Sequence, residues 1–225
     1  MKHLVPDGSV ILKEIKENGI YKFDKPLSQP KLLEEALCRA NEHFAAPGNN
    51  YEFGKACRIG GHKTESRDAI HQAFSSPLIW DIARGFFGTS TLFSEIFLTH
   101  DYVSGGPPGR NGWLHFDRIP TLKFFMHLTN IDKDNGPFCY VPGSYKLGKE
   151  MRNKSKAEES QYAKVKNRLE VDFPELGYTT ESATPILGPP GTMFAFHSDL
   201  FHCGGNTKEG YERKIVRLHL RNHSG

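Results

Sequence analysis

The chain has 225 residues and a formal net charge of +3, and its length suits one well-buried domain or two small ones at most. The weak charge and the lack of a basic stripe with interleaved aromatic residues argue against a nucleic-acid partner, and no stretch approaches the roughly 20 apolar residues of a membrane span. No apolar leader follows the first residues and the four cysteines are widely spaced, so we expect a cytoplasmic protein with free thiols.

The first third of the chain is predicted to be mainly helical. Ser9 is a candidate N-cap for a first helix that ends at Gly19, and a short strand is expected at 20–23. Pro30 suits the first turn of a second helix, and Gly88 suits the end of the last one. The predicted helices cover residues 9–18, 28–46 and 67–87, the last with a break at 75–77.

From residue 89 onward the pattern changes to strands, with many aromatic and branched residues between turns rich in Gly and Pro. Two strands have one apolar face and one polar or aromatic face, which suits a sheet that packs on helices and lines a pocket. The charged stretch 145–170 is predicted to be a helical or mobile insertion, and a solvated helix is favoured over a cover that attracts an anionic substrate. The predicted strands are 91–103, 113–117, 121–130, 138–141, 191–197 and 214–220, with a loop at 104–112.

The segment His115-Phe116-Asp117 carries the clearest chemical signal. On a strand, residues i and i+2 project to the same face, so His115 and Asp117 offer an imidazole and a carboxylate to one metal ion. His202 follows a later predicted strand and is the candidate third ligand, with His197 as its competitor. Two histidines and a carboxylate on one side of a metal leave open positions, which is the arrangement of non-haem Fe(II) oxygenases.

Arg213 opens the last predicted strand and is a candidate clamp for a 2-oxoglutarate co-substrate. A guanidinium group matches the distal carboxylate of that molecule with two parallel hydrogen bonds. The keto-acid end would then chelate iron and leave one position for O2. Arg217 lies on the same predicted face and is the rival clamp.

The chain resembles the phytanoyl-CoA dioxygenase family of Fe(II)/2-oxoglutarate-dependent oxygenases. The resemblance covers about residues 90–220, and its most specific part is the block that ends in DNGPFCYVPGSY. Tyr145 stands where the family often has histidine. The segments that carry the resemblance are Trp113–Asp117, Lys123–Ser144, and Gly191–Asn206 followed by Arg213.

The resemblance implies a mainly β fold, with a double-stranded β-helix (a cupin-like jelly roll) and packing helices mostly from the N-terminal third. We expect a single Fe(II)/2-oxoglutarate dioxygenase domain over residues 1–225. In this division, residues 1–88 are helical support, and residues 89–225 are the jelly-roll core with the charged insertion 145–170.

The resemblance also implies that His115, Asp117 and His202 hold Fe(II) as the catalytic metal ligands, with Arg213 holding 2-oxoglutarate. The glycines behind His202 favour it over His197, which is expected to be a pocket or supporting residue. Arg118 is expected to point away as a surface charge. Further candidates on the predicted pocket face are Phe125, which is implied to pack near the co-substrate, and Lys123, His127 and Thr129 for co-substrate or substrate.

Asp117 sets the expected reaction, because related halogenases have a small residue where this chain keeps a carboxylate. We therefore expect hydroxylation of an unactivated C–H of a small-molecule metabolite, with release of succinate and CO2. The identity of the substrate and the oligomeric state are not predicted. The alternatives are a Zn²⁺-dependent hydrolase on the same three ligands and a non-catalytic jelly-roll binding protein. The Arg213 clamp and the block from DNGP to PGS argue against the hydrolase, and the complete ligand set with its clamp argues against the binding protein.

Overall fold

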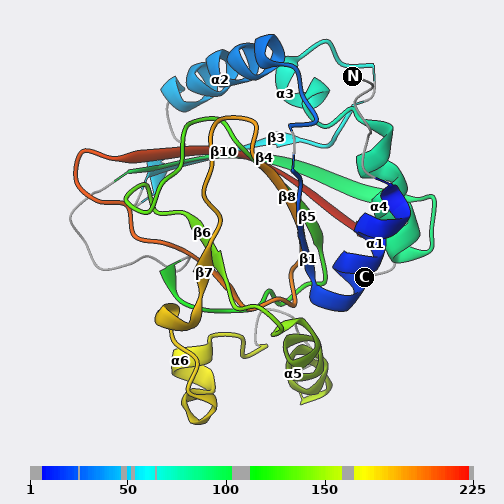
Figure 1. Cartoon of the computed structure of the whole chain (residues 1–225), viewed down its shortest axis with the longest axis vertical. Helices are drawn as coiled ribbons and strands as arrows, with labels where there is room; N and C mark the ends of the chain where they lie inside the picture. The colour runs from blue at the N-terminus through cyan, green and yellow to red at the C-terminus, as the bar shows by residue number, and fades with distance from the viewer. Residues whose placement is uncertain are drawn as a thin grey trace.

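The structure is a computed structural model that describes residues 7–24, 26–46, 50–51, 54–63, 65–102, 112–158 and 165–222. Two antiparallel sheets face each other (Figure 1). The large sheet has seven strands in the order β1-β8-β5-β10-β4-β3-β2, and the small sheet has three in the order β7-β6-β9. Two facing antiparallel sheets, in which paired strands are distant from each other in the sequence, form a jelly roll. The predicted mainly β fold with packing helices is thus confirmed.

The elements of the described residues have the following bounds. The strands are β1 Ile20–Lys22, β2 Asn50–Tyr51, β3 Gly54–Gly60, β4 Leu92–Tyr102, β5 Leu122–His127, β6 Phe138–Tyr140, β7 Thr184–Pro185, β8 Met193–His197, β9 His202–Gly204 and β10 Glu212–Asn222. The helices are α1 Gly8–Asn18, α2 Pro30–Ala45, α3 Ala69–Gln72, α4 Pro77–Phe87, α5 Tyr145–Glu158 and α6 Leu169–Asp172, with short 3-10 helices at Pro174–Leu176 and Thr180–Ser182.

The outer face of the large sheet is covered by the helices of the N-terminal third, with α2 and α3 above it and α1 and α4 at one end (Figure 1). Leu122 and Phe124 of β5 and Leu218 of β10 are fully buried in this layer. Each such side chain contributes about 1.5–3 kcal/mol when it leaves water. The apolar face that alternation predicts for these strands is therefore the face that packs on helices.

The inner face of the large sheet meets the small sheet through aromatic rings. Phe138 of β6 lies with its ring centroid 4.9 Å from that of Phe194 and 4.5 Å from that of Phe196, both on β8. Phe125 of β5 meets Phe196 edge-on at 5.0 Å. The alternate residues of β5 thus lie between the two sheets, as the two-faced pattern predicts.

The N-terminal third differs from its prediction in two respects. The N-cap of α1 is Asp7, whose carboxylate accepts a hydrogen bond from the backbone N–H of Ser9, so the prediction of Ser9 was wrong by two positions. Gly19 ends α1 in the left-handed conformation, as predicted. Strands β2 and β3 were not predicted, because their short sequence has no clear alternation and β3 is held by pairing with β4.

The charged insertion is partly confirmed as helical. Residues 145–158 form α5, but one side of this helix is buried, including Arg152, which is 7% exposed. Nε and Nη2 of Arg152 donate to the two carboxylate oxygens of the fully buried Asp199, the second at 3.1 Å. Gly148 allows this close approach, because a Cβ there would collide with the carbonyl oxygen of Asp199.

Three other sequence predictions concern a loop, the cysteines and membrane spans. The predicted loop 104–112 lies outside the described residues, apart from residue 112. The cysteines Cys38, Cys57, Cys139 and Cys203 are all free thiols, as expected. Among the described helices, none combines the length and the apolar character needed to cross a membrane.

Candidate metal centre

The segment that carries His115 and Asp117 is not a regular strand, contrary to the prediction for residues 113–117. Only His115 makes β-bridges, one to His202 and one to Arg168. The backbones of His115 and His202 exchange two hydrogen bonds, at 2.9 and 2.8 Å. The extended backbone still sends the side chains at 115 and 117 to one side. Pairing with the start of β9 brings the histidine from the distant part of the chain beside them.

The three predicted ligands converge in the structure. One ligand atom from each of His115, Asp117 and His202 lies within 4.8 Å of the others. Oδ1 of Asp117 is 3.8 Å from Nε2 of His115 and 3.7 Å from Nε2 of His202. One carboxylate oxygen and two imidazole nitrogens form the donor set that suits Fe(II). Three donors leave the other coordination positions of the metal open. His197 is not part of this group, and its ring stacks on Phe86 instead.

The backbone fixes which nitrogen of each imidazole faces the centre. Nδ1 of His115 lies 2.7 Å from the carbonyl oxygen of Trp113, and Nδ1 of His202 lies 2.6 Å from that of Leu200. A carbonyl oxygen only accepts, so each Nδ1 carries the proton and donates it. Nε2 is then the lone-pair nitrogen of both rings, which is the state that binds a metal.

The electrostatics of the centre also favour the metal-binding forms. Burial lowers the pKa of His202 to about 3 and also lowers the pKa of His115, so both imidazoles are neutral near pH 7. Burial by itself would raise the pKa of Asp117, but Lys123 and the two histidines together hold that pKa well below its usual value. Neutral imidazoles and an ionised carboxylate need lose no proton before they bind a metal.

Lys123 of β5 lies against the carboxylate of Asp117. Its ammonium group forms an ion pair with Oδ2, whereas Oδ1 faces the two histidines. The side chain of Lys123 is buried and also lies over the ring of Phe196. Through this ion pair Lys123 orients Asp117, and its role in binding co-substrate or substrate stays a prediction.

The remaining residues of the predicted pocket face lie farther along the same inner surface. Nε and Nη2 of Arg213 donate to Oδ2 of Asp101 on β4, at 2.9 and 2.6 Å. The guanidinium carbon of Arg217 lies 5.7 Å from the ring centroid of Phe125 and equally far from that of Phe97. Both arginines therefore remain candidates for the carboxylate clamp.

Two further candidates have backbone partners. The ring of the buried His127 lies with Nδ1 3.4 Å from the carbonyl oxygen of Gly188. The hydroxyl of Thr129 accepts a hydrogen bond from the backbone N–H of Lys214 at 3.1 Å. These contacts explain the placement of both side chains without a ligand.

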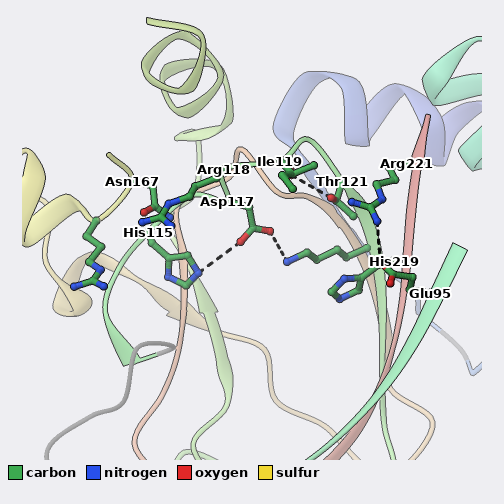
Figure 2. A pocket seen from close by; sticks show the side chains of 11 residues that line it. Glu95, His115, Asp117, Arg118, Ile119, Thr121, Asn167, His219 and Arg221 are labelled. Carbon is green, nitrogen blue, oxygen red and sulfur yellow. Dashed lines mark hydrogen bonds and ion pairs between the residues drawn. The ribbon is translucent and has the colours of Figure 1, made fainter. Parts of the chain in front are cut away.

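A cavity of about 380 Å³ opens beside the centre (Figure 2). Its wall includes His115 and Asp117, and it also includes Arg118, so the expectation that Arg118 points away as a surface charge was wrong. Because residues 113–117 are not a regular strand, strict alternation does not continue to position 118. The other lining residues are Glu95, Ile119, Thr121, Lys123, Asn167, Arg168, His219 and Arg221.

Most of these lining residues were not predicted. His219 could have been found, since it alternates with Arg217 on the polar face of β10 and its Cα is paired with that of Lys123. Asn167 and Arg168 gave no such signal within their charged stretch. They reach the cavity because backbone hydrogen bonds hold their segment against residues 114–116. The N–H of Phe116 donates to the carbonyl oxygen of Asn167, and the N–H of Leu169 donates to that of Leu114.

Two buried histidines outside the metal centre should make the free energy of unfolding depend on pH. Burial lowers the pKa of His127 and of His197 to about 4 each, against roughly 6.5 in an unfolded chain. Between these values the unfolded state binds more protons, so stability is complete above pH 6.5 and falls as the pH is lowered. Urea unfolding of the metal-free protein at about pH 5 should show a loss on the order of 2 kcal/mol per histidine relative to pH 7. The variant His127→Gln should show a smaller loss, and equal stability at both pH values would contradict the assignment.

Known proteins resemble this chain in sequence profile and in fold. A profile of the phytanoyl-CoA dioxygenase (PhyH) family matches residues 43–215. Among curated protein sequences, none matches the chain. Among solved structures, EctD from S. alaskensis with 2-oxoglutarate and 5-hydroxyectoine has a TM-score of 0.68 and 14% identity, over 100% of this chain and 79% of that one.

Two more solved structures share the fold. The epimerase SnoN, in complex with Fe3+, alpha ketoglutarate and nogalamycin RO, has a TM-score of 0.66 and 13% identity, over 96% of this chain and 83% of that one. EvdMO1 has a TM-score of 0.61 and 15% identity, over 96% of this chain but only 50% of that one. The chain thus spans half the length of EvdMO1. At these identities, the similarity shows a common fold.

Proposed function

Because the chain belongs to the phytanoyl-CoA dioxygenase family, we propose that it is an Fe(II)- and 2-oxoglutarate-dependent oxygenase. We propose further that it hydroxylates an unactivated C–H of a small-molecule metabolite. The observation that carries this proposal is the convergence of His115, Asp117 and His202, with Nε2 of both imidazoles and Oδ1 of the carboxylate facing one point. The ion pair between Asp117 and Lys123 supports the proposal, because the buried ammonium group holds the carboxylate in place.

The residues of the site would have the following roles. His115, Asp117 and His202 would hold the iron; bound iron, with 2-oxoglutarate and O2, supplies the oxidation and yields succinate and CO2. Lys123 keeps Oδ2 of Asp117 engaged, so that the carboxylate presents Oδ1 alone. The rings of Phe138 and Phe196 lie 5.6 and 5.1 Å from the ring of His202 and exclude water from that side.

Arg213 is the proposed clamp for the distal carboxylate of 2-oxoglutarate. Asp101 accepts from Nε and Nη2 of its guanidinium group, which holds the fork in a fixed orientation on the inner face. Both residues are buried, so a carboxylate that reaches Arg213 would meet a guanidinium group removed from water. Charge-assisted hydrogen bonds are strongest in such surroundings.

Replacement of the two candidate arginines separates their roles. The variant Arg213→Gln is expected to weaken 2-oxoglutarate binding by about 10- to 100-fold, the effect of losing a charge-assisted bidentate contact. Arg217→Gln should change the affinity far less. Calorimetric titration of the Mn(II)-loaded protein with 2-oxoglutarate measures both. Since Asp101 loses its partner in Arg213→Gln, circular dichroism and Arg213→Lys are needed as controls for folding. The opposite ranking would transfer the clamp to Arg217.

A single assay separates the proposed function from its alternatives. Anaerobic loading with Fe(II), followed by O2 and 2-oxoglutarate with a metabolite library, should give succinate release that one class of compounds stimulates. A Zn²⁺-dependent hydrolase would instead take up zinc and cleave esters or amides without 2-oxoglutarate. A binding protein without catalysis would release no succinate at all.

A further inference from the structure

The cavity beside the metal centre has more positive than negative groups in its wall. The cationic side chains are Arg118, Lys123, Arg168 and Arg221, and the carboxylates are Glu95 and Asp117. Two of the cations are already paired. Lys123 binds Asp117, and Arg221 donates to Glu95 at 3.0 Å, where Glu95 also pairs with Arg58. Each carboxylate is thus already paired with a cationic side chain, and Asp117 would also bind the proposed metal.

Arg118 and Arg168 have no ion pair within the described part of the chain. Nε of Arg118 donates to the carbonyl oxygen of Val165 at 2.9 Å. The guanidinium carbon of Arg168 lies 4.3 Å from the ring centroid of Trp113. Both side chains are half-buried. A guanidinium group has five N–H donors, so each arginine retains donors that neither the carbonyl oxygen nor the aromatic face occupies.

Both arginines are anchored to the ligands of the metal centre by the backbone. Arg118 directly follows Asp117, and Arg168 forms a β-bridge with His115. Figure 2 shows the side chains of Arg118 and Asn167 beside each other above His115, at the same end of the cavity. Arg213 and Arg217, the candidates for the co-substrate carboxylate, are not part of this wall.

We propose that Arg118 and Arg168 form an oxyanion subsite for the substrate of the enzyme. The substrate would carry a carboxylate or phosphate group that binds the two guanidinium groups while its reactive carbon lies at the His115 and Asp117 end of the cavity. The anion supplies the missing counter-charge, and planar guanidinium forks match the oxygens of either group. This inference rests on the proposed function only in assigning the anion to the substrate.

Trp113 provides a direct reporter of the subsite, since its ring lies under Arg168. The chain has two tryptophans, and Trp80 lies in α4, outside the cavity wall. In the background Trp80→Phe, the fluorescence of Trp113 can be followed as inorganic phosphate or acetate is added, with sodium chloride at matched ionic strength. The protein is first loaded anaerobically with Fe(II) and saturated with 2-oxoglutarate.

We expect a saturable fluorescence change with phosphate, acetate or both, and none with chloride. The variants Arg118→Gln and Arg168→Gln should each weaken the response about tenfold or more. The control Arg67→Gln removes the same charge from an exposed position outside the cavity wall and should leave the response unchanged. Arg118→Lys keeps the charge without the fork, so a response weaker than that of the unmodified protein would show that geometry matters as well as charge.

The source of the anion is decided by which probe binds, since a stronger response to acetate indicates a carboxylate and a stronger response to phosphate indicates a phosphate ester. An equal response to chloride, or equal responses in all arginine variants, would overturn the subsite. Loss of the Fe(II)–2-oxoglutarate absorption band on addition of the anion would also overturn it, because the anion would then occupy the co-substrate position. Absence of that band from the start would contradict the proposed function instead, and the anion titration of the metal-free protein would still test the subsite.

Discussion

The variant Asp117→Ala is expected to abolish the release of succinate that depends on Fe(II) and substrate. The change removes the only carboxylate of the three converging ligands and leaves the buried ammonium group of Lys123 without its ion pair. A positive charge beside the site would then repel a divalent cation. Replacing a residue that hydrogen-bonds to a metal ligand typically lowers metal affinity or activity by about 10- to 100-fold. Replacing a ligand itself should therefore lower them by more than about a hundredfold.

Metal content and activity should be measured together for this variant. Iron retained by the purified protein is expected to fall with the activity, while circular dichroism should remain that of the folded chain. The matched control Asp81→Ala removes a carboxylate that is 68% exposed on α4 and should keep both iron and activity. The double variant Asp117→Ala/Lys123→Met removes the unpaired charge and should recover stability but not activity. Undiminished turnover in Asp117→Ala would refute the metal centre.

The variant Asp199→Ala is expected to cost about 3–5 kcal/mol of the free energy of unfolding, because it leaves the guanidinium group of Arg152 buried without a partner. Asp199 is fully buried, and its backbone N–H also donates to Nδ1 of His197 at 3.2 Å. The ion pair ties α5 to the turn between β8 and β9, directly before His202. Urea denaturation at neutral pH measures the loss.

Two controls show whether the buried ion pair is the cause. The exposed pair Asp81 and Arg84 is similar in chemistry, and Asp81→Ala should cost less than about 1 kcal/mol. The double variant Asp199→Leu/Arg152→Met removes both charges and should be more stable than Asp199→Ala, since no unpaired charge remains. If Asp199→Ala and Asp81→Ala lowered stability equally, the ion pair would not hold α5 in place.

The sequence by itself determined the fold class, the family and the identity of the converging side chains. Alternation along residues 122–128 separated an apolar face from a polar one, and burial of that apolar face against helices follows from the period of a strand alone. His115, Asp117 and His202 were found because their residue types and their position beside strands suit a metal with open positions. The jelly roll and the family followed from the resemblance of three segments to a known family, whereas the apolar face and the ligand residue types are local features of the sequence.

The tertiary structure decided which charges meet. The sequence predicted Lys123 on the pocket face and Arg118 on the surface, yet both line the cavity. Lys123 lies against Asp117, whereas Arg118 has no ion pair among the described residues. Arg168 looked like part of a solvated stretch, and only its bridge to His115 brings it to the cavity. Periodicity assigns each residue to a face but does not specify its partner across space. The partners of Asp117, Arg213 and Asp199 are therefore set by contacts between segments that are distant in the chain.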